Sequence, residues 1–308
     1  MIPVKFSRKQ LEELYPNDEA CLQKLFLLKY SDVKKCTKCK KPFKYHKLKN
    51  LRLYSCQFCG WNIAPTANTI FHKSPTPLTD WFYVIYLFSI SKNGLSAKEI
   101  ERHLGVTYKC AWRIANRVRM LFDATNNPNG DKSIKSGDNL KNTVEIDETY
   151  WGGVSTGLKA KEYKDRGTRY KRSSKKPIFG MVERGGMIKA KVVINPRRRT
   201  VMPLIRKNIE IGTQIMSDKY HDYRILPELG YPHQTVVHRR KEWTRGKVYT
   251  NTIEGFWSQL KRSLNGTYHM VSPKYLQSYV NEFSWRYNQR QNPVPSFYLL
   301  SDNLGKKV

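Results

Sequence analysis

The chain has 308 residues, of which 56 are lysine or arginine and 25 are aspartate or glutamate, giving a formal net charge of +31. This excess of positive charge indicates a polyanionic partner, which is either nucleic acid or an anionic membrane. The longest apolar run, residues 81–90, is about half the length of a membrane-spanning helix, so we expect a buried helix there and no membrane association. The charge then indicates nucleic acid, which the motifs below specify as double-stranded DNA.

The first five residues contain no apolar signal core, which favours a protein that stays in the cytoplasm, associated with the nucleoid. Cysteines are kept reduced in that compartment. The six cysteines of the chain are therefore better explained by metal binding than by disulfides.

Residues 1–74 are predicted to form a zinc-ribbon module. They contain two C-x2-C pairs separated by sixteen residues, Cys36 with Cys39 and Cys56 with Cys59. Two tight turns at this spacing can each present two thiolates to one tetrahedral Zn²⁺. We expect one structural zinc ion on a small β-ribbon with a cationic face, and the pattern leaves open whether the ribbon itself contacts DNA.

Residues 75–124 are predicted to form a helix-turn-helix DNA-binding domain. Ser96 and Glu99 have the spacing of a capping box, and Gly105 permits a sharp turn before a second helix that starts at Tyr108. That helix carries four basic candidates for DNA contact, Lys109, Arg113, Arg117 and Arg119. It has the pattern of a recognition helix in a major groove, although a helical hairpin that only links two modules is the alternative.

A polar linker is predicted at residues 125–142, followed by a core at 143–292 and a C-terminal tail at 293–308. Short β-branched runs in the core alternate with segments of helical periodicity, which indicates an α/β fold. The runs are Val144–Ile146, Lys191–Ile194, Thr213–Met216 and Thr235–Val237. The polar segment 152–176 is expected to be a mobile loop or insertion, and a later helix is expected to be capped by Ser272.

Three acidic residues of the core are candidate metal ligands. Asp147 and Asp218 each follow a predicted strand, and Glu254 lies on a predicted helix. Ligand sites in α/β sheets lie at the ends of strands. Phosphodiester transfer uses two divalent cations about 4 Å apart, which carboxylates hold.

Helical geometry places Glu254 and Lys261, which are seven residues apart, within about 20° of each other, whereas Asn251 falls roughly 60 to 80° away. A carboxylate and an ammonium group would thus face the same cleft edge. Four further residues remain as rivals or neighbours of the site: Glu145, Glu148, Asp222 and His238. For His238 we favour a bond to the local backbone over a role in the site.

Three segments of the core, 144–150, 217–220 and 251–262, together with Gly266-Thr267-Tyr268-His269, resemble motifs of a known family. The chain resembles bacterial insertion-sequence transposases with an N-terminal zinc ribbon, a group related to the Merlin transposases. The resemblance covers about Leu11 to Tyr298. It implies an RNase H-like core, that is, a mixed sheet flanked by helices.

The resemblance also implies a DDE transposase that binds terminal inverted repeats, cuts the transposon ends and joins them to target DNA as a homo-oligomer. It implies two Mg²⁺ (or Mn²⁺) ions per active site, held by Asp147, Asp218 and a third residue that is Asn or Glu in this group. Both Asn251 and Glu254 are present, and we choose Glu254 because of its step to Lys261, next to which Arg262 is a further DNA-binding candidate.

Two alternatives remain at this point. One is a domesticated transposase that has lost catalysis and acts as a DNA-binding regulator, although all the required acids are present. The other is a structure-selective nuclease on the same fold, which would cut without joining. A zinc ribbon combined with a helix-turn-helix favours end-specific recombination over the nuclease.

Overall fold

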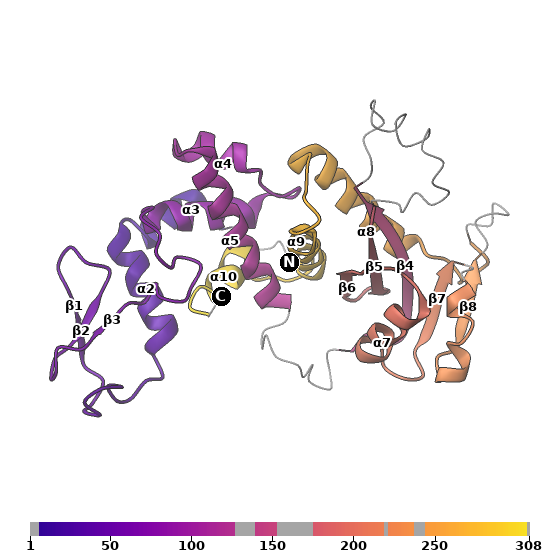
Figure 1. The fold of residues 1–308 in the computed structure, drawn as a ribbon, viewed down its shortest axis with the longest axis horizontal. Helices are drawn as coiled ribbons and strands as arrows, with labels where there is room; N and C mark the ends of the chain where they lie inside the picture. Colours follow the sequence, from indigo (N-terminus) through magenta and orange to yellow (C-terminus); the bar gives the residue numbers. More distant parts are fainter. Residues whose placement is uncertain (1–5, 127–138, 153–174, 219–220, 237–243, 307–308) are drawn as a thin grey trace, which may run out of the picture. The chain divides into compact units, whose positions relative to one another are not determined.

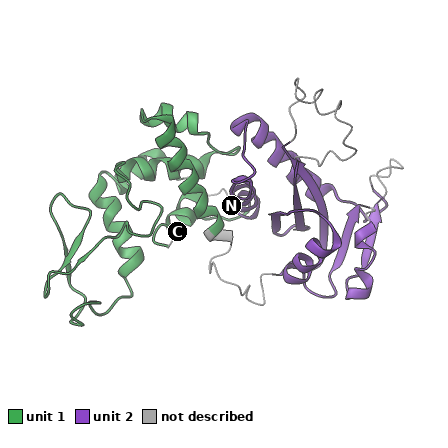
Figure 2. Ribbon diagram, viewed as in Figure 1, with its two compact units in different colours: residues 1–130, 291–308 green, residues 131–290 purple. Residues whose placement is uncertain are grey.

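The computed structural model describes residues 6–126, 139–152, 175–218, 221–236 and 244–306. The chain forms two compact units (Figure 2): unit 1 comprises residues 1–130 and 291–308, and unit 2 comprises residues 131–290. Most of the predicted linker, most of the polar segment 152–176, and His238 lie outside the described residues.

Unit 1 combines helices with a small antiparallel sheet of order β1-β2-β3 (Figure 1). Its strands are β1 (Tyr45–Lys47), β2 (Tyr54–Cys56) and β3 (Asn62–Ile63). Its helices are α1 (Arg8–Leu14), α2 (Asp18–Tyr30), α3 (Leu78–Ile90), α4 (Ala97–Leu104), α5 (Tyr108–Asn126) and α10 (Ser296–Ser301). The apolar run 81–90 lies in α3 and is mostly buried, as predicted.

The turn between α4 and α5 confirms the local prediction. The Ser96 hydroxyl accepts a hydrogen bond from the Glu99 N–H at 3.1 Å, and the Glu99 carboxylate accepts one from the Ser96 N–H at 2.8 Å. Gly105 then takes a φ of 65°, in the left-handed region that glycine tolerates without a Cβ penalty. Ser96 and Glu99 thus cap the start of α4, and Gly105 ends it, so that a short turn leads to α5.

The C-terminal segment is part of unit 1. Helix α10 packs against α3 and α5. The Phe297 ring stacks on Phe6, with ring centroids 4.4 Å apart and planes 4° from parallel. The chain therefore leaves unit 1, builds unit 2, and returns to complete the first core.

Unit 2 has a five-stranded mixed sheet of order β6-β5-β4-β7-β8. Strands β4, β5 and β6 pair antiparallel, whereas β4, β7 and β8 pair parallel. The strands are β4 (Thr143–Trp151), β5 (Lys176–Glu183), β6 (Ile188–Val192), β7 (Gln214–Asp218) and β8 (His233–Val236). The helices are α7 (Arg198–Asn208), α8 (Asn251–Ser263) and α9 (Leu276–Asn288), with short helical turns η1 (His221–Tyr223), η2 (Pro227–Leu229) and η4 (Leu264–Tyr268).

Each face of this sheet has its own hydrophobic core. Val144, Ile146 and Ile205 belong to the cluster on the α7 face. Ile253 and Trp257 belong to the cluster that α8 and α9 form on the other face. Because side chains alternate along a strand, Glu145 and Asp147 share the α8 face of β4, whereas Glu148 shares the α7 face with Ile146.

Three local predictions differ from the structure. Asp147 is expected directly after the first strand, but β4 continues to Trp151, so Asp147 lies within the strand, where it pairs with Gly180 of β5. Strand β5 was not predicted, because Pro177 and Gly180 weaken the strand pattern in its sequence. Helix α9 begins at Leu276 with Tyr275 as its N-cap residue, so Ser272 does not cap it. Among the described residues, none of the helices is both long enough and apolar enough to cross a bilayer.

Candidate active site and metal centre

Four cysteines of unit 1 form a compact cluster at the β-ribbon. All four Sγ atoms of Cys36, Cys39, Cys56 and Cys59 lie within 4.8 Å of one another. The Sγ atoms of Cys36 and Cys59 are 3.9 Å apart, as are those of Cys39 and Cys56. Tetrahedral zinc with Zn–S bonds of about 2.3 Å requires S···S separations of about 3.8 Å. The thiol geometry therefore fits a four-coordinate metal ion.

A tyrosine supports this cluster. The Tyr45 hydroxyl lies 3.1 Å from the Cys36 sulfur and can donate to its thiolate form. This hydrogen bond is the largest cause that lowers the pKa of Cys36, to about 6. A thiolate at neutral pH is the form that binds metal.

The predicted carboxylates come from two neighbouring parallel strands and one helix. Ile146 pairs with Ser217 in the parallel ladder of β4 and β7, so Asp147 and Asp218 occupy the next position of the same register. Glu254 lies in the first turn of α8. Thus, carboxylates that are 36 to 107 positions apart in the sequence lie near one another at the C-terminal end of β7.

The pKa of Asp147 reflects this grouping. Burial, together with the nearby negative charges of Glu254 and Asp218, raises it to about 6, and hydrogen bonds from the Glu148 backbone and from Trp257 partly oppose this increase. The Trp257 indole N–H donates to the Asp147 carboxylate at 3.0 Å. The site thus concentrates negative charge in a partly desolvated place, which a cation would stabilise.

Glu148 extends the acidic group onto the α7 face of the sheet. Burial, followed by the charges of Asp147 and Asp218, raises its pKa to about 8. The Tyr223 hydroxyl donates to its carboxylate. Glu148 therefore has a protein partner on the face away from Trp257.

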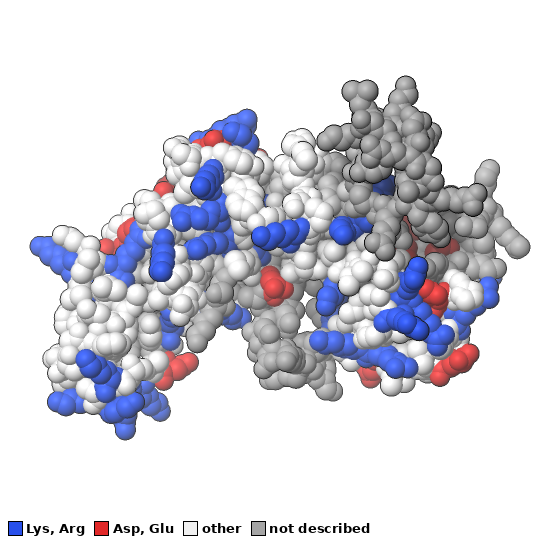
Figure 3. Space-filling model, in the orientation of Figure 1, with Lys and Arg blue, Asp and Glu red and all other residues white. Residues whose placement is uncertain are grey.

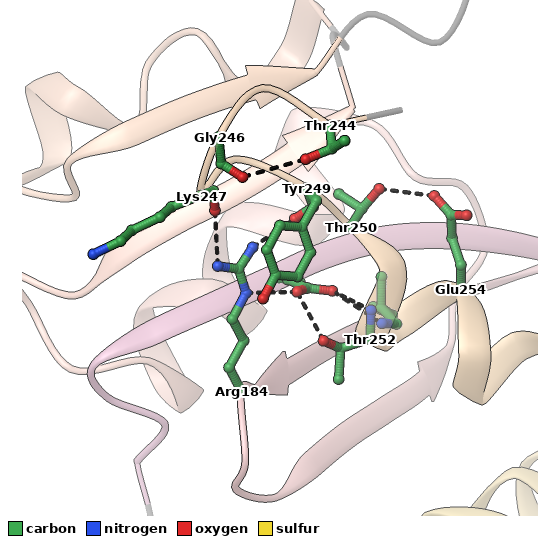
Figure 4. Close-up of polar contacts among 10 residues, drawn as sticks. Arg184, Thr244, Gly246, Lys247, Tyr249, Thr250, Thr252 and Glu254 are labelled. Atoms are coloured by element: carbon green, nitrogen blue, oxygen red, sulfur yellow. Dashed lines mark hydrogen bonds and ion pairs between the residues drawn. The ribbon is translucent and has the colours of Figure 1, made fainter. Parts of the chain in front are cut away.

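Glu254 is oriented by the residue that precedes its helix. The Thr250 hydroxyl, one residue before α8, donates to the Glu254 carboxylate at 2.8 Å (Figure 4). Glu254 is half-buried, whereas Asn251, Lys261 and Arg262 are exposed. The negative charge of Glu254 acts on the pKa of Asp147, so the two carboxylates lie near each other.

Glu145, a rival ligand in the sequence, has a different place. It is fully buried and forms an ion pair with Arg184 at 2.7 Å. The backbone N–H groups of Thr252 and Ile253 also donate to it, at 2.8 and 3.0 Å. Figure 4 shows Arg184 continuing to the carbonyl oxygens of Lys247 and Tyr249. Glu145 therefore fastens the N-terminus of α8 to β4.

Gly180 on β5 is a site residue that sequence reasoning missed. A Cβ atom at this position would lie 2.6 Å from a ring carbon of Trp257 and 3.1 Å from the Ile253 side chain. The absence of a side chain lets α8 approach the sheet closely enough for Trp257 to reach Asp147. Its only signal in the sequence is a glycine inside an otherwise apolar strand.

The carboxylates are more widely spaced than the thiols. Among the described residues, only the cysteine cluster has ligand atoms that all lie within 4.8 Å of one another, so the oxygens of Asp147, Asp218 and Glu254 spread further. Two cations about 4 Å apart, each with bonds of about 2.1 Å, span about 8 Å between their outer ligands. Carboxylate oxygens are also the donors that Mg²⁺ and Mn²⁺ prefer, so the residues present fit such a pair.

The basic residues predicted on α5 do not all face solvent, and for Arg119 the prediction of DNA contact is wrong. Its side chain is 2% exposed, donates to the Leu95 carbonyl oxygen and lies over the Phe88 ring. The periodicity of the sequence places it away from the apolar side of the helix, but the loop after α3 covers it. It stabilises the interior instead.

Arg113 and Arg117 are half-buried. Arg117 donates to the carbonyl oxygens of Ile70 and His72 at 2.8 and 2.7 Å, and Arg113 approaches the Ser74 hydroxyl at 3.4 Å. Lys109, at the start of α5, is exposed. The solvent-facing basic character of α5 is therefore concentrated at its N-terminal end.

Comparison with known proteins gives two matches. Residues 139–288 match the ISXO2-like transposase domain. An uncharacterized transposase-like protein of Haemophilus influenzae is 25% identical over 100 residues, which is 32% of this chain and 80% of that protein.

These matches confirm the resemblance to insertion-sequence transposases. A transposase domain implies an RNase H-like core, and the mixed sheet of unit 2 with helices on both faces agrees with it. The matched segment contains β4, β7 and α8, the three elements that carry Asp147, Asp218 and Glu254.

Proposed function

Because residues 139–288 match an insertion-sequence transposase domain, we propose that this protein is a DDE transposase that binds the terminal inverted repeats of its element, cuts the ends and joins them to target DNA. The observation that carries the proposal is the grouping of Asp147, Asp218 and Glu254 at one sheet edge, expressed in the raised pKa of Asp147.

In this proposal Asp147, Asp218 and Glu254 hold two Mg²⁺ or Mn²⁺ ions. When bound, these ions activate the attacking hydroxyl and stabilise the leaving oxygen. Trp257 orients the Asp147 carboxylate by its hydrogen bond, and Thr250 orients Glu254. Both bonds fix an oxygen in place before the ligand arrives, which reduces the entropy lost on binding.

The exposed cations of α8, Lys261 and Arg262, would contact DNA phosphates beside this site. Unit 1 would contribute specificity for the transposon ends through α4 and α5, with Lys109 as the exposed basic residue of the predicted set. The cysteine cluster would hold one Zn²⁺ that maintains the fold of the ribbon. Pairing two ends requires an oligomer, and we propose a homo-oligomer.

The proposed domain boundaries are a zinc-ribbon module at 1–74, a helix-turn-helix domain at 75–124, a linker at 125–142, the catalytic core at 143–292 and a tail at 293–308. These segments divide the chain by chemical role. The compact units divide it by packing, since the tail lies in unit 1.

The test is strand transfer with purified full-length protein, the element's own ends and Mg²⁺. Asp147→Asn, Asp218→Asn and Glu254→Gln are each expected to abolish cutting and joining while DNA binding stays close to wild type. Glu228→Gln, which removes an exposed carboxylate on η2, is the matched control and should retain activity.

Each alternative predicts its own result. Cutting without joining by the wild-type protein would support the nuclease. Specific binding to the ends with neither reaction would support the regulator. Loss of joining in Asn251→Ala together with its retention in Glu254→Gln would move the third ligand to Asn251.

A further inference from the structure

A concave surface on unit 2 is not used by the proposed site. It has a volume of about 430 Å³ and is lined by Arg198, Arg199, Met202, Pro203, Arg206, Ile225 and Leu229. We call it the α7 groove. Its floor is apolar, and its rim carries three arginines from one helix.

The three arginines are exposed and available. In the part of the chain that the structure describes, no carboxylate lies within ion-pair distance of the Arg198, Arg199 or Arg206 guanidinium groups. Two of them lie in the first turn of α7, where the helix dipole disfavours positive charge. Figure 3 shows lysine and arginine side chains gathered over the part of unit 2 where α7 lies. These exposed guanidinium groups are therefore open to an anionic ligand.

The groove begins beside the acidic edge of the sheet. The Arg198 backbone N–H donates to the Asp222 carboxylate at 3.0 Å. Asp222 in turn is close enough to Glu148 to raise the pKa of Glu148, and Glu148 is next to Asp147 in β4. The first turn of α7 therefore lies near Glu148, on the face of β4 opposite Asp147.

The spacing of the arginines fits a nucleic-acid strand. Arg199 and Arg206 are seven residues apart, so they lie within about 20° on one face and about 10 Å apart along the helix axis. One DNA strand advances 3.4 Å per nucleotide along the duplex axis, so this distance covers about three nucleotides of a duplex that lies along α7. Guanidinium groups at that distance can bind separate phosphates.

From these observations we infer that the α7 groove binds the sugar-phosphate backbone of the DNA adjoining the phosphodiester bond held at the carboxylates. The inference rests on the proposed function for its position, because that function places DNA at Asp147. It assigns Arg198, Arg199 and Arg206 to backbone contact over about three nucleotides. It assigns them no contact with bases, so they add affinity without sequence preference.

The test compares two triple variants of full-length protein. The groove variant is Arg198→Gln, Arg199→Gln, Arg206→Gln. The control is Lys141→Gln, Lys191→Gln, Lys274→Gln, which removes the same charge from exposed positions of unit 2 outside the groove. Binding to duplex DNA carrying the element's end is measured without Mg²⁺ over a range of salt concentrations.

Each phosphate contact contributes about 0.9 to the slope of log affinity against log salt, so the groove variant should lose about two to three units of slope and bind at least about tenfold more weakly at low salt. The control should lose much less. Replacing single phosphates near the end with neutral methylphosphonates should weaken wild-type binding at up to about three neighbouring positions, and leave the groove variant unchanged there.

Equal salt slopes for the two triple variants would overturn the inference, as would methylphosphonate effects that persist in the groove variant. Both results are independent of catalysis. Retained joining by Asp147→Asn would instead contradict the proposed function, whatever the binding data show. The single variant Arg206→Gln repeats the binding test at the position furthest from the first turn.

Discussion

At the scale of single residues, the same chemical group takes different roles according to its surroundings. Glu145 and Asp147 are two positions apart on one face of β4. Glu145 is fully buried and neutralised by Arg184, whereas Asp147 is only partly buried and is surrounded by other carboxylates. The first is suited to hold a helix, and the second to bind a cation.

We predict that Glu145→Ala destabilises unit 2 by about 3 to 5 kcal/mol, because it leaves the Arg184 charge and two N–H groups of α8 without a partner. Glu145→Gln should cost less, since its amide oxygen still accepts hydrogen bonds. Hydrogen exchange of the first turn of α8 measures the effect. Glu210→Ala, at an exposed position, is the control, and equal exchange in the two alanine variants would contradict the role given to Glu145.

A second prediction at the scale of single residues concerns how stability depends on pH. Burial lowers the pKa of His233 below its ordinary 6.5, and its ring nitrogen lies 2.8 Å from the Ser217 hydroxyl. The folded state thus binds the proton more weakly than the unfolded state. The stability that neutral His233 contributes is present above about pH 6.5 and is lost as the pH falls through the folded pKa.

Protection of β8 amides against hydrogen exchange, compared between wild type and His233→Asn, measures this contribution. The extra protection of β8 amides in wild type should shrink as the pH falls from about 7.5 to about 5. The comparison is needed because the raised pKa of Asp147 acts in the opposite direction, adding stability as the pH falls. A constant difference between the two proteins would exclude the effect.

At the scale of elements, the position of α8 depends on a glycine in the sheet, which has no side chain. Gly180 leaves room for the Trp257 ring, and Glu145 receives the N-terminus of the helix. The helix N-terminus, its middle and the strand beneath it are thereby fixed together. The orientation of Glu254 follows from this packing and from Thr250.

We predict that Gly180→Ala destabilises unit 2 by about 1 to 3 kcal/mol through overpacking and displaces the Trp257 indole from Asp147. The metal-dependent strand-transfer activity of this variant should also fall. Gly255→Ala is the matched control: it lies in α8 with nothing within 4 Å of an added Cβ, so it should stabilise the helix by about 0.5 to 1 kcal/mol. Calorimetry of both variants checks the pair, and similar effects would refute the close-approach argument.

At the scale of the whole molecule, the two units are built from a chain that returns to its beginning. Unit 1 needs residues 291–308, because α10 packs on α3 and α5 and Phe297 stacks on Phe6. Unit 2 lies between the two parts of unit 1 in the sequence. Stability of the first unit therefore depends on residues that follow unit 2 in the sequence.

We predict that Phe297→Ala destabilises unit 1 by about 3 to 5 kcal/mol, because the ring is almost fully buried. Amides of α3 and α5 should lose protection in hydrogen exchange, whereas those of β4 and β5 should keep it. Val294→Ala, at a position that is 43% exposed, should leave both sets unchanged. Loss of protection in both units would contradict the division into separate cores.

The sequence by itself determined motif spacings and helix ends. The cysteine spacing predicted the four-thiol cluster, and Ser96, Glu99 and Gly105 predicted the α4–α5 turn. A β-branched run precedes Asp147 and another precedes Asp218, and the structure places Asp218 at the end of β7 but Asp147 within β4. The helix cap and turn are formed by residues close in the chain, whereas the thiol cluster and the carboxylate group also require segments that are far apart in the sequence.

The tertiary structure decided what depends on residues far apart in the chain. Only packing shows that Arg119 is buried under the loop after α3, that Glu145 is paired with Arg184, and that Gly180 admits Trp257. The α7 groove likewise forms only where α7 lies next to the segment that contains Ile225 and Leu229. Burial and charge are properties of surroundings, and a periodic pattern specifies which face of an element is apolar without specifying what will cover it.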